Sequence, residues 1–119
     1  MLQSRGDDAR GPDPEVPVYQ LTALYNQPED PAGFDKHYEN VHAPLASKLP
    51  GLQRFTVNRP GPDPEGNAPA YHLIAVLDFD DETAFGAALG SAEGQAAVAD
   101  LANFAGAGVT MLTGPSSLV

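Results

Sequence analysis

The chain has 119 residues, which fits one domain with a hydrophobic core, and it contains no cysteine, which excludes disulfide bonds and thiolate metal sites. Its 6 lysine and arginine residues stand against 16 aspartate and glutamate residues, a formal net charge of −10, so neither nucleic acid nor an anionic membrane surface is an expected partner. No apolar run reaches the roughly 20 residues of a membrane-spanning helix and the start lacks a signal peptide, so we expect a cytoplasmic protein that binds a small molecule, another protein or a second copy of itself.

Residues 1–15 are polar and rich in proline and glycine, which predicts a flexible acidic tail before a domain that spans 16–119. The sequence GPDPE ends this tail and recurs at 61–65. Because proline fixes φ and removes a backbone donor, the second copy predicts an extended or turning loop. Two copies in a proline-rich acidic chain indicate shared composition rather than a repeat architecture.

Residues 16–25 alternate between two faces and predict a first strand. After it, Asp30 followed by Pro31 predicts the start of a helix, because aspartate caps a helix and proline suits its first turn. Projected at about 100° per residue, four side chains of this helix fall in one narrow stripe, which we expect to face the sheet. They are Phe34, Tyr38, Val41 and Leu45.

The same helix carries His37 and His42, and Pro44 follows them. The ring of Pro44 clashes with the carbonyl four residues earlier, so the helix should end or kink near His42. In a regular helix the two histidines lie about 140° apart, which disfavours a shared zinc site and leaves His37 on the surface. At the helix end, His42 either caps a free carbonyl or, with its pKa raised by the helix terminus, is placed for proton transfer beside Tyr38 and Glu39.

The second half of the chain predicts strands at 51–59 and 70–79, a helix from about 81 to 104 that is interrupted at Gly90 and capped again at Ser91, and a last strand at 109–114. The order β-α-β-β-α-β is that of the ferredoxin-like α+β fold, a four-stranded antiparallel sheet with both helices on one face. The third strand is apolar on both faces. A sheet with two apolar faces needs a second cover, which predicts an isologous homodimer with sheet against sheet.

Two segments carry a resemblance to a known family: LYNQPED with FDKHYENVHAPLASKLPGL, and DLANFAGAGVTMLTG. They resemble the EthD family, named for an ethyl tert-butyl ether degradation protein, over about residues 18–114. The most specific element is the H-x-P-L at 42–45, and further matching positions are Tyr25, Pro28, Phe34, Tyr38, Pro50, Gly51, Asp100 and Phe104. The resemblance implies a dimeric α+β barrel, in which a cavity between the sheet and the helices of each subunit is bordered by the motif histidine.

The resemblance also implies a range of activities, from cofactor-free monooxygenases, cyclases, isomerases and dehydratases to haem proteins. A haem needs an axial ligand, and residues 82–104 contain no histidine, cysteine, methionine or tyrosine. The sequence also lacks a glycine-rich phosphate loop that opens a helix after a strand, and a G-x-S-x-G elbow. We therefore expect neither a cofactor nor a metal.

With this resemblance, the chain is interpreted as a small cofactor-independent enzyme. It would act on an aromatic or polyketide-like molecule by histidine-assisted proton transfer, in a cyclisation, dehydration, isomerisation or oxygenation. His42 would be the general base or acid, and Tyr38 or Tyr25 would position a phenol or enolate. The other candidate substrate-binding residues are apolar wall residues and two polar ones: Phe34, Leu24, Phe55, Val57, Arg54 and His72.

Several alternatives stay open. Arg54 either orients a substrate carboxylate or carbonyl or is solvated, and His72, on the face of Ile74 and Val76, either packs in its strand or lines the pocket. Asp100 is expected to hydrogen-bond the sheet or the first helix, or else to take part in catalysis. The alternative function is a non-catalytic accessory protein of a degradation or biosynthetic pathway that binds a hydrophobic small molecule. A third reading is a purely structural dimer in which His42 caps a helix.

Overall fold

The computed structural model describes residues 18–119, so the tail predicted at 1–15 lies outside the described residues. Four antiparallel strands form one sheet in the order β2-β3-β1-β4. The strands are β1 (Val18–Asn26), β2 (Arg54–Asn58), β3 (Tyr71–Phe79) and β4 (Val109–Ser116). This strand order, with one helical segment in each crossover, confirms the predicted ferredoxin-like α+β fold.

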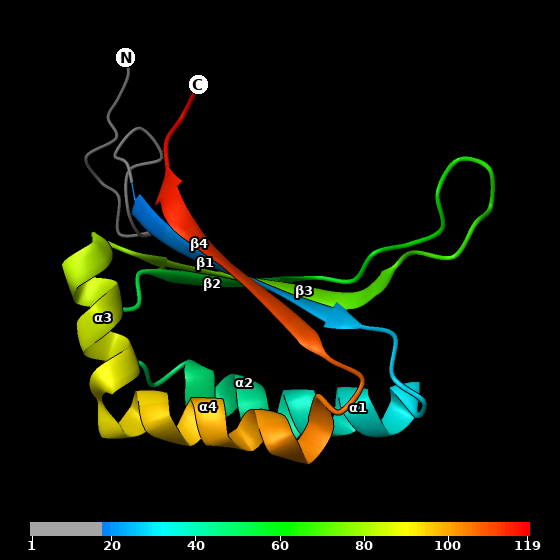
Figure 1. Ribbon diagram of the computed structural model, residues 1–119, viewed down its shortest axis with the longest axis horizontal. Helices are drawn as coiled ribbons and strands as arrows, with labels where there is room; N and C mark the ends of the chain where they lie inside the picture. Colours follow the sequence, from blue (N-terminus) through cyan, green and yellow to red (C-terminus); the bar gives the residue numbers. More distant parts are fainter. Residues whose placement is uncertain (1–17) are drawn as a thin grey trace.

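The helices all lie against one face of the sheet (Figure 1). The first crossover comprises α1 (Pro31–His37), the π-helical turn η2 (Tyr38–His42) and α2 (Ala43–Ala46), and the second comprises α3 (Glu82–Gly90) and α4 (Ala92–Phe104). As predicted, Asp30 caps α1 and Ser91 caps α4, because their side-chain oxygens accept backbone N–H bonds at 3.1 and 3.0 Å. Within residues 18–119, no helix is long and apolar enough to cross a membrane.

The helix that contains Pro44 was predicted to end or kink near His42, and it does not end there, because the chain continues through the π turn into α2. Through η2 the backbone hydrogen bonds span five residues instead of four, as in the bond from the Ala43 N–H to the Tyr38 carbonyl. The wider turn makes room for the proline ring, which in a regular helix would press against the carbonyl of Asn40. A proline that breaks a regular helix is therefore accommodated by one π turn.

The same turn changes which side chains of this helix face the sheet. Phe34 and Tyr38 are buried, as predicted, but Val41 is exposed. The buried stripe continues instead through His42 and Ala46. A histidine thus occupies the interior position that a regular helix would give to a valine.

The sheet carries apolar side chains on both faces, as its sequence predicts. The helix-facing side holds the core residues Ala23, Tyr25, Leu73, Ala75, Leu77 and Phe79. The register places Leu24 beside Ile74, and Thr22 beside Val76 and Leu112, on the other side. No helix of the described chain covers that side, which we call the open face (Figure 1).

Candidate functional site

A cavity of about 420 Å³ lies between the helix-facing side of the sheet and the helices. Its wall is mostly apolar, and its polar lining side chains are Tyr25, Tyr38, His42 and Thr113. The first three surround the ring of Phe104, with ring centroids 5.6, 5.8 and 4.7 Å away, respectively. Tyr25, Tyr38 and His42 therefore form one cluster, which we call the polar end of the cavity.

His42 reaches the cavity from η2 and is held from behind by Asp100 of α4. Its Nδ1 lies 3.0 Å from Oδ2 of Asp100, and the two side chains are only 8% and 6% exposed. Within residues 18–119, no hydrogen-bond partner meets the other ring nitrogen, Nε2. One edge of the imidazole is thus fixed by a carboxylate, while the ring forms part of the cavity wall.

Asp100 is a buried carboxylate with three donors around it. In addition to His42, the Nε2 of His37 lies 2.9 Å from its Oδ1, and the Nδ2 of Asn103 donates to the same oxygen at 3.0 Å. Burial alone would raise the pKa of Asp100, but the hydrogen bonds from Asn103, His37 and His42 outweigh it and hold the pKa below its ordinary value. Asp100 is therefore ionised at neutral pH and accepts from all three neighbours.

An ionised carboxylate only accepts, so the Nδ1 of His42 carries the proton of their hydrogen bond. Burial lowers the pKa of His42, and the opposing hydrogen bond and charge of Asp100 do not restore it. This contradicts the rise predicted for a histidine at a helix end, because the helix continues past His42. A neutral imidazole with its proton on Nδ1 keeps a free lone pair on Nε2, which makes His42 an available base at neutral pH.

His37 is not the surface residue that a regular helix predicts. Its Nε2 lies 2.9 and 3.0 Å from the two oxygens of Asp100. The π turn that follows His37 brings residues five apart onto one side, so His37 and His42 share a carboxylate instead of lying about 140° apart. The sequence indicated this contact only through Asp100, for which a hydrogen bond to the first helix was one of the open alternatives.

In the part of the chain that the structure describes, no group of three or more acidic or histidine side chains could hold a metal ion.

The two tyrosines of the polar end are each only 2% exposed. Their rings meet edge to face at 5.7 Å, and Phe34 packs against both. Burial raises the pKa of both phenols, so both remain protonated donors. Among residues 18–119, neither hydroxyl has a hydrogen-bond partner. Buried polar groups normally have partners, so these hydroxyls indicate a place for a ligand or water.

The other predicted substrate-binding residues lie in different places. Phe55 of β2 lines the cavity. Val57 is on the helix-facing side, opposite Ala75, but it is exposed and is not part of the cavity wall. Leu24 and Arg54 lie on the open face, away from the cavity. Phe34 supports the tyrosine rings and lines a separate hollow of about 610 Å³ at the start of α1.

His72 points toward the helices and not, as predicted, to the side of Ile74 and Val76. Tyr25 of β1 pairs with Leu73 of β3, and the next residue, Asn26, pairs with Tyr71. His72 lies between these two partners and is the extra residue of a β-bulge. Such a bulge redirects a side chain. The ring of His72 consequently meets Phe34 edge to face, with centroids 5.0 Å apart.

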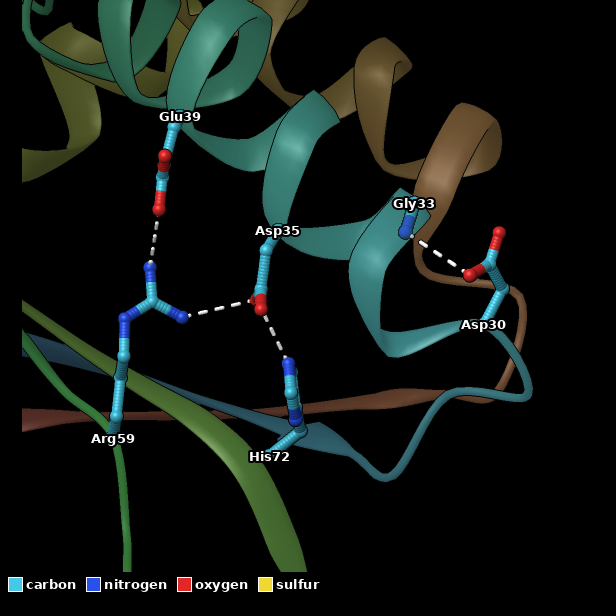
Figure 2. A network of polar contacts seen from close by, with 6 residues as sticks. All are labelled: Asp30, Gly33, Asp35, Glu39, Arg59 and His72. Atoms are coloured by element: carbon cyan, nitrogen blue, oxygen red, sulfur yellow. Dashed lines mark hydrogen bonds and ion pairs between the residues drawn. The ribbon is translucent and has the colours of Figure 1, made fainter.

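The bulge also brings His72 to a polar network outside the cavity (Figure 2). Its Nε2 lies 2.8 Å from Asp35 of α1, and the same carboxylate accepts from Arg59 at 3.0 Å. The second guanidinium nitrogen of Arg59 donates to Glu39 at 3.1 Å. Although burial opposes it, hydrogen bonds and charges from His72 and Arg59 lower the pKa of Asp35. The network fastens α1 and η2 to the end of the β2–β3 hairpin.

Comparison with known proteins gives consistent matches at the level of family and fold. The EthD domain profile matches residues 26–108. An uncharacterized 11.0 kDa protein in the thcB-thcC intergenic region of Rhodococcus erythropolis is 44% identical over 95 residues, which covers 80% of this chain and 91% of the relative. The crystal structure of an ethyl tert-butyl ether degradation family protein from Bacillus halodurans has a TM-score of 0.77 at 39% identity, covering 82% of this chain and 96% of that one.

A more distant solved structure shows the fold alone. SnoaB from Streptomyces nogalater, described as a cofactor-independent oxygenase, has a TM-score of 0.56 at 17% identity. The match covers 87% of this chain and 94% of SnoaB.

Proposed function

This chain belongs to the EthD family, and on that premise we propose that it is a small cofactor-independent enzyme that acts on an aromatic or polyketide-like molecule, with His42 as general base. One observation carries the proposal. A buried, neutral imidazole has its Nδ1 held by Asp100 and its Nε2 unpartnered among residues 18–119, in the wall of an apolar cavity. A carrier of hydrophobic metabolites needs no buried acid–base pair, so this geometry favours an enzyme over an accessory protein.

The proposed step is abstraction of a proton from a carbon next to a carbonyl, or from a phenol. Nε2 of His42 takes the proton, and the electron pair of the broken bond remains on the substrate as an enolate or phenolate. Asp100 stabilises the imidazolium that forms, through the bond to Nδ1. Tyr25 and Tyr38 stay protonated because their pKa values are raised, so they donate to the developing oxyanion.

This proton transfer is common to cyclisation, dehydration, isomerisation and oxygenation. The apolar wall supports it, because a dry surrounding strengthens the hydrogen bonds to the developing charge. SnoaB, which is described as a cofactor-independent oxygenase, supports the view that this fold accommodates chemistry without a cofactor. That support is an analogy of fold, whereas the His42–Asp100 pair belongs to this chain.

The test is hydrogen–deuterium exchange at the carbon next to the carbonyl of 2-tetralone, followed by proton NMR in deuterated buffer. We expect the protein to accelerate exchange above buffer, and His42→Gln to abolish the acceleration while calorimetry still detects binding of 2-tetralone. Binding without acceleration in the unmodified protein would favour the accessory role. Absence of both would overturn the proposed function.

We also propose that the protein is a homodimer whose open faces pack together. The open face carries Leu24, Ile74, Val76 and Leu112, and no described helix covers it. Native mass spectrometry should show a dimer, and Leu112→Lys should dissociate it. Val98→Lys is the matched control, since Val98 on α4 is 54% exposed and Leu112 is 53% exposed. A monomeric unmodified protein would contradict the proposal.

A further inference from the structure

The cavity wall changes character along its length. Tyr25, Tyr38 and His42 meet at the end beside Phe104, whereas Leu21, Leu77 and Phe85 line the opposite end. Within the described chain, the lining includes no lysine, arginine, aspartate or glutamate. A carboxylate or phosphate on a ligand would therefore find no charged partner, and burying an unpaired charge is costly. The wall fits an uncharged body whose reactive polar group lies at the polar end, because the Thr113 hydroxyl is the single polar side chain that the described lining adds elsewhere.

The distance between the two ends is longer than one aromatic ring requires. From Tyr25 to Leu21 the strand β1 advances by four residue steps, which is about 13 Å at the rise of an extended strand. On the opposite wall, α4 lines the cavity from Gly94 to Leu101, which is about 10 Å at the rise of a helix. Both walls give room for two fused rings, or for a ring with an attached chain.

Three lining side chains outside the polar end are exposed to solvent: Leu89, Val98 and Met111. They come from α3, α4 and β4, respectively. A single exposed hydrophobic side chain is ordinary, but three that belong to the same cavity wall mark its opening. The cavity therefore meets solvent where these three side chains lie, outside the polar end. We call these three residues the rim.

We propose that the ligand is an elongated, uncharged molecule that binds in one orientation. Its acidic polar group, a phenol or an enolisable carbonyl, lies at the polar end, and its apolar body extends along α4 to the rim. This inference rests on the proposed function, because it takes His42 as the group that meets the reactive end. It adds the shape of the substrate class: two or more rings or a substantial alkyl chain, with no anionic group on the apolar body.

The test compares phenol with 4-hexylphenol, two ligands that differ only in the apolar body. The chain has two methionines, Met1 and Met111, and three histidines, so methyl-labelled methionine and ring-labelled histidine give few, assignable NMR signals. We expect both ligands to shift the ring signals of His42 and only 4-hexylphenol to shift the methyl of Met111. Because each buried methylene is worth several-fold in affinity, 4-hexylphenol should bind at least about tenfold more tightly.

Val98→Glu places a carboxylate at the rim and should reduce the ratio of the two affinities toward one. Val41→Glu is the control, since Val41 is exposed on η2 and lies outside the cavity, and it should keep the ratio. Equal affinities with a silent Met111 and a responding His42 would overturn this inference and leave the proposed function standing. If neither ligand shifts His42, the proposed function fails as well. A change of native mass in Val98→Glu would assign the rim to an interface and overturn the inference.

Discussion

Asp100 and Asp35 each hold a histidine at hydrogen-bond distance, His42 at 3.0 Å and His72 at 2.8 Å. The two pairs differ in burial and in the side chains that surround them. Asp100 is 6% exposed and His42 8%, and their further neighbours are His37 and Asn103. Asp35 is 37% exposed and His72 17%, and Asp35 also pairs with the permanent cation Arg59.

The surroundings of an aspartate–histidine pair, and not the pairing itself, therefore decide what the pair does. In the buried pair, loss of water disfavours a charged His42, so the carboxylate orients a neutral base toward an apolar cavity. In the exposed pair, Asp35 is one link in a chain of ion pairs that joins a helix to a hairpin (Figure 2). The first pair is suited to proton transfer and the second to holding the fold.

Replacing the histidine of each pair should have its most different effect on the rate of catalysis. His42→Gln should slow exchange of 2-tetralone by about 100-fold or more, because general-base catalysis contributes at least that factor. His72→Gln should remain within a few-fold of the unmodified protein, since His72 is not part of the cavity wall. Rates from proton NMR check this, and similar losses in both variants would abolish the distinction.

The second largest difference is expected in how much stability each aspartate contributes. Asp100→Ala leaves the buried His42 and the half-buried His37 without their acceptor and should lower the free energy of unfolding by about 3 kcal/mol. Asp35→Ala breaks exposed pairs and should cost less than about 1 kcal/mol. Urea unfolding followed by circular dichroism measures both. Equal costs would mean that the burial of Asp100 does not matter.

The stability contributions of His42 and of the two aspartates should be lost in different pH ranges. Because the folded-state pKa of His42 is below its ordinary value of about 6.5, the unfolded chain takes up the proton first as pH falls. Stability should therefore decline as pH drops below about 6.5, and His42→Gln should flatten that decline. Both aspartates have lowered pKa values, so their contributions should persist until pH falls below about 3.9. Urea unfolding at a series of pH values tests the two windows, and an unchanged slope in His42→Gln would refute the first.

The smallest effect is expected for the exposed network. Arg59→Gln removes two exposed ion pairs and should cost about 0.5 kcal/mol, a loss that fades as salt rises toward 1 M. The cost of Asp100→Ala should be much less sensitive to salt, because buried pairs are poorly screened. Unfolding curves at low and high salt give the comparison, and a salt-sensitive Asp100→Ala would place that carboxylate in solvent.

The order of the elements could be predicted from the sequence because each is set by local signals. Alternating strands, the Asp30–Pro31 start and the Ser91 cap act within a few residues, and all three appear in the structure. The tail and the first two residues of the predicted first strand lie outside the described residues.

The site could be predicted only in part, because two local irregularities rearrange it. A π turn accommodates Pro44, carries the helix past His42 and brings His37 to Asp100, none of which a regular projection contains. A β-bulge turns His72 to the other side of its strand. Both are departures from the periodic geometry on which side-chain placement from sequence depends.

We conclude that burial keeps His42 neutral and that Asp100 holds the remaining proton on Nδ1, so that Nε2 is the base. Long-range nitrogen–proton NMR of the histidine rings reports which ring nitrogen of His42 carries a proton, because protonated and unprotonated ring nitrogens have well-separated chemical shifts. At pH 7 we expect His42 to show a protonated Nδ1 and an unprotonated Nε2. A proton on Nε2, or a doubly protonated ring at that pH, would contradict the account.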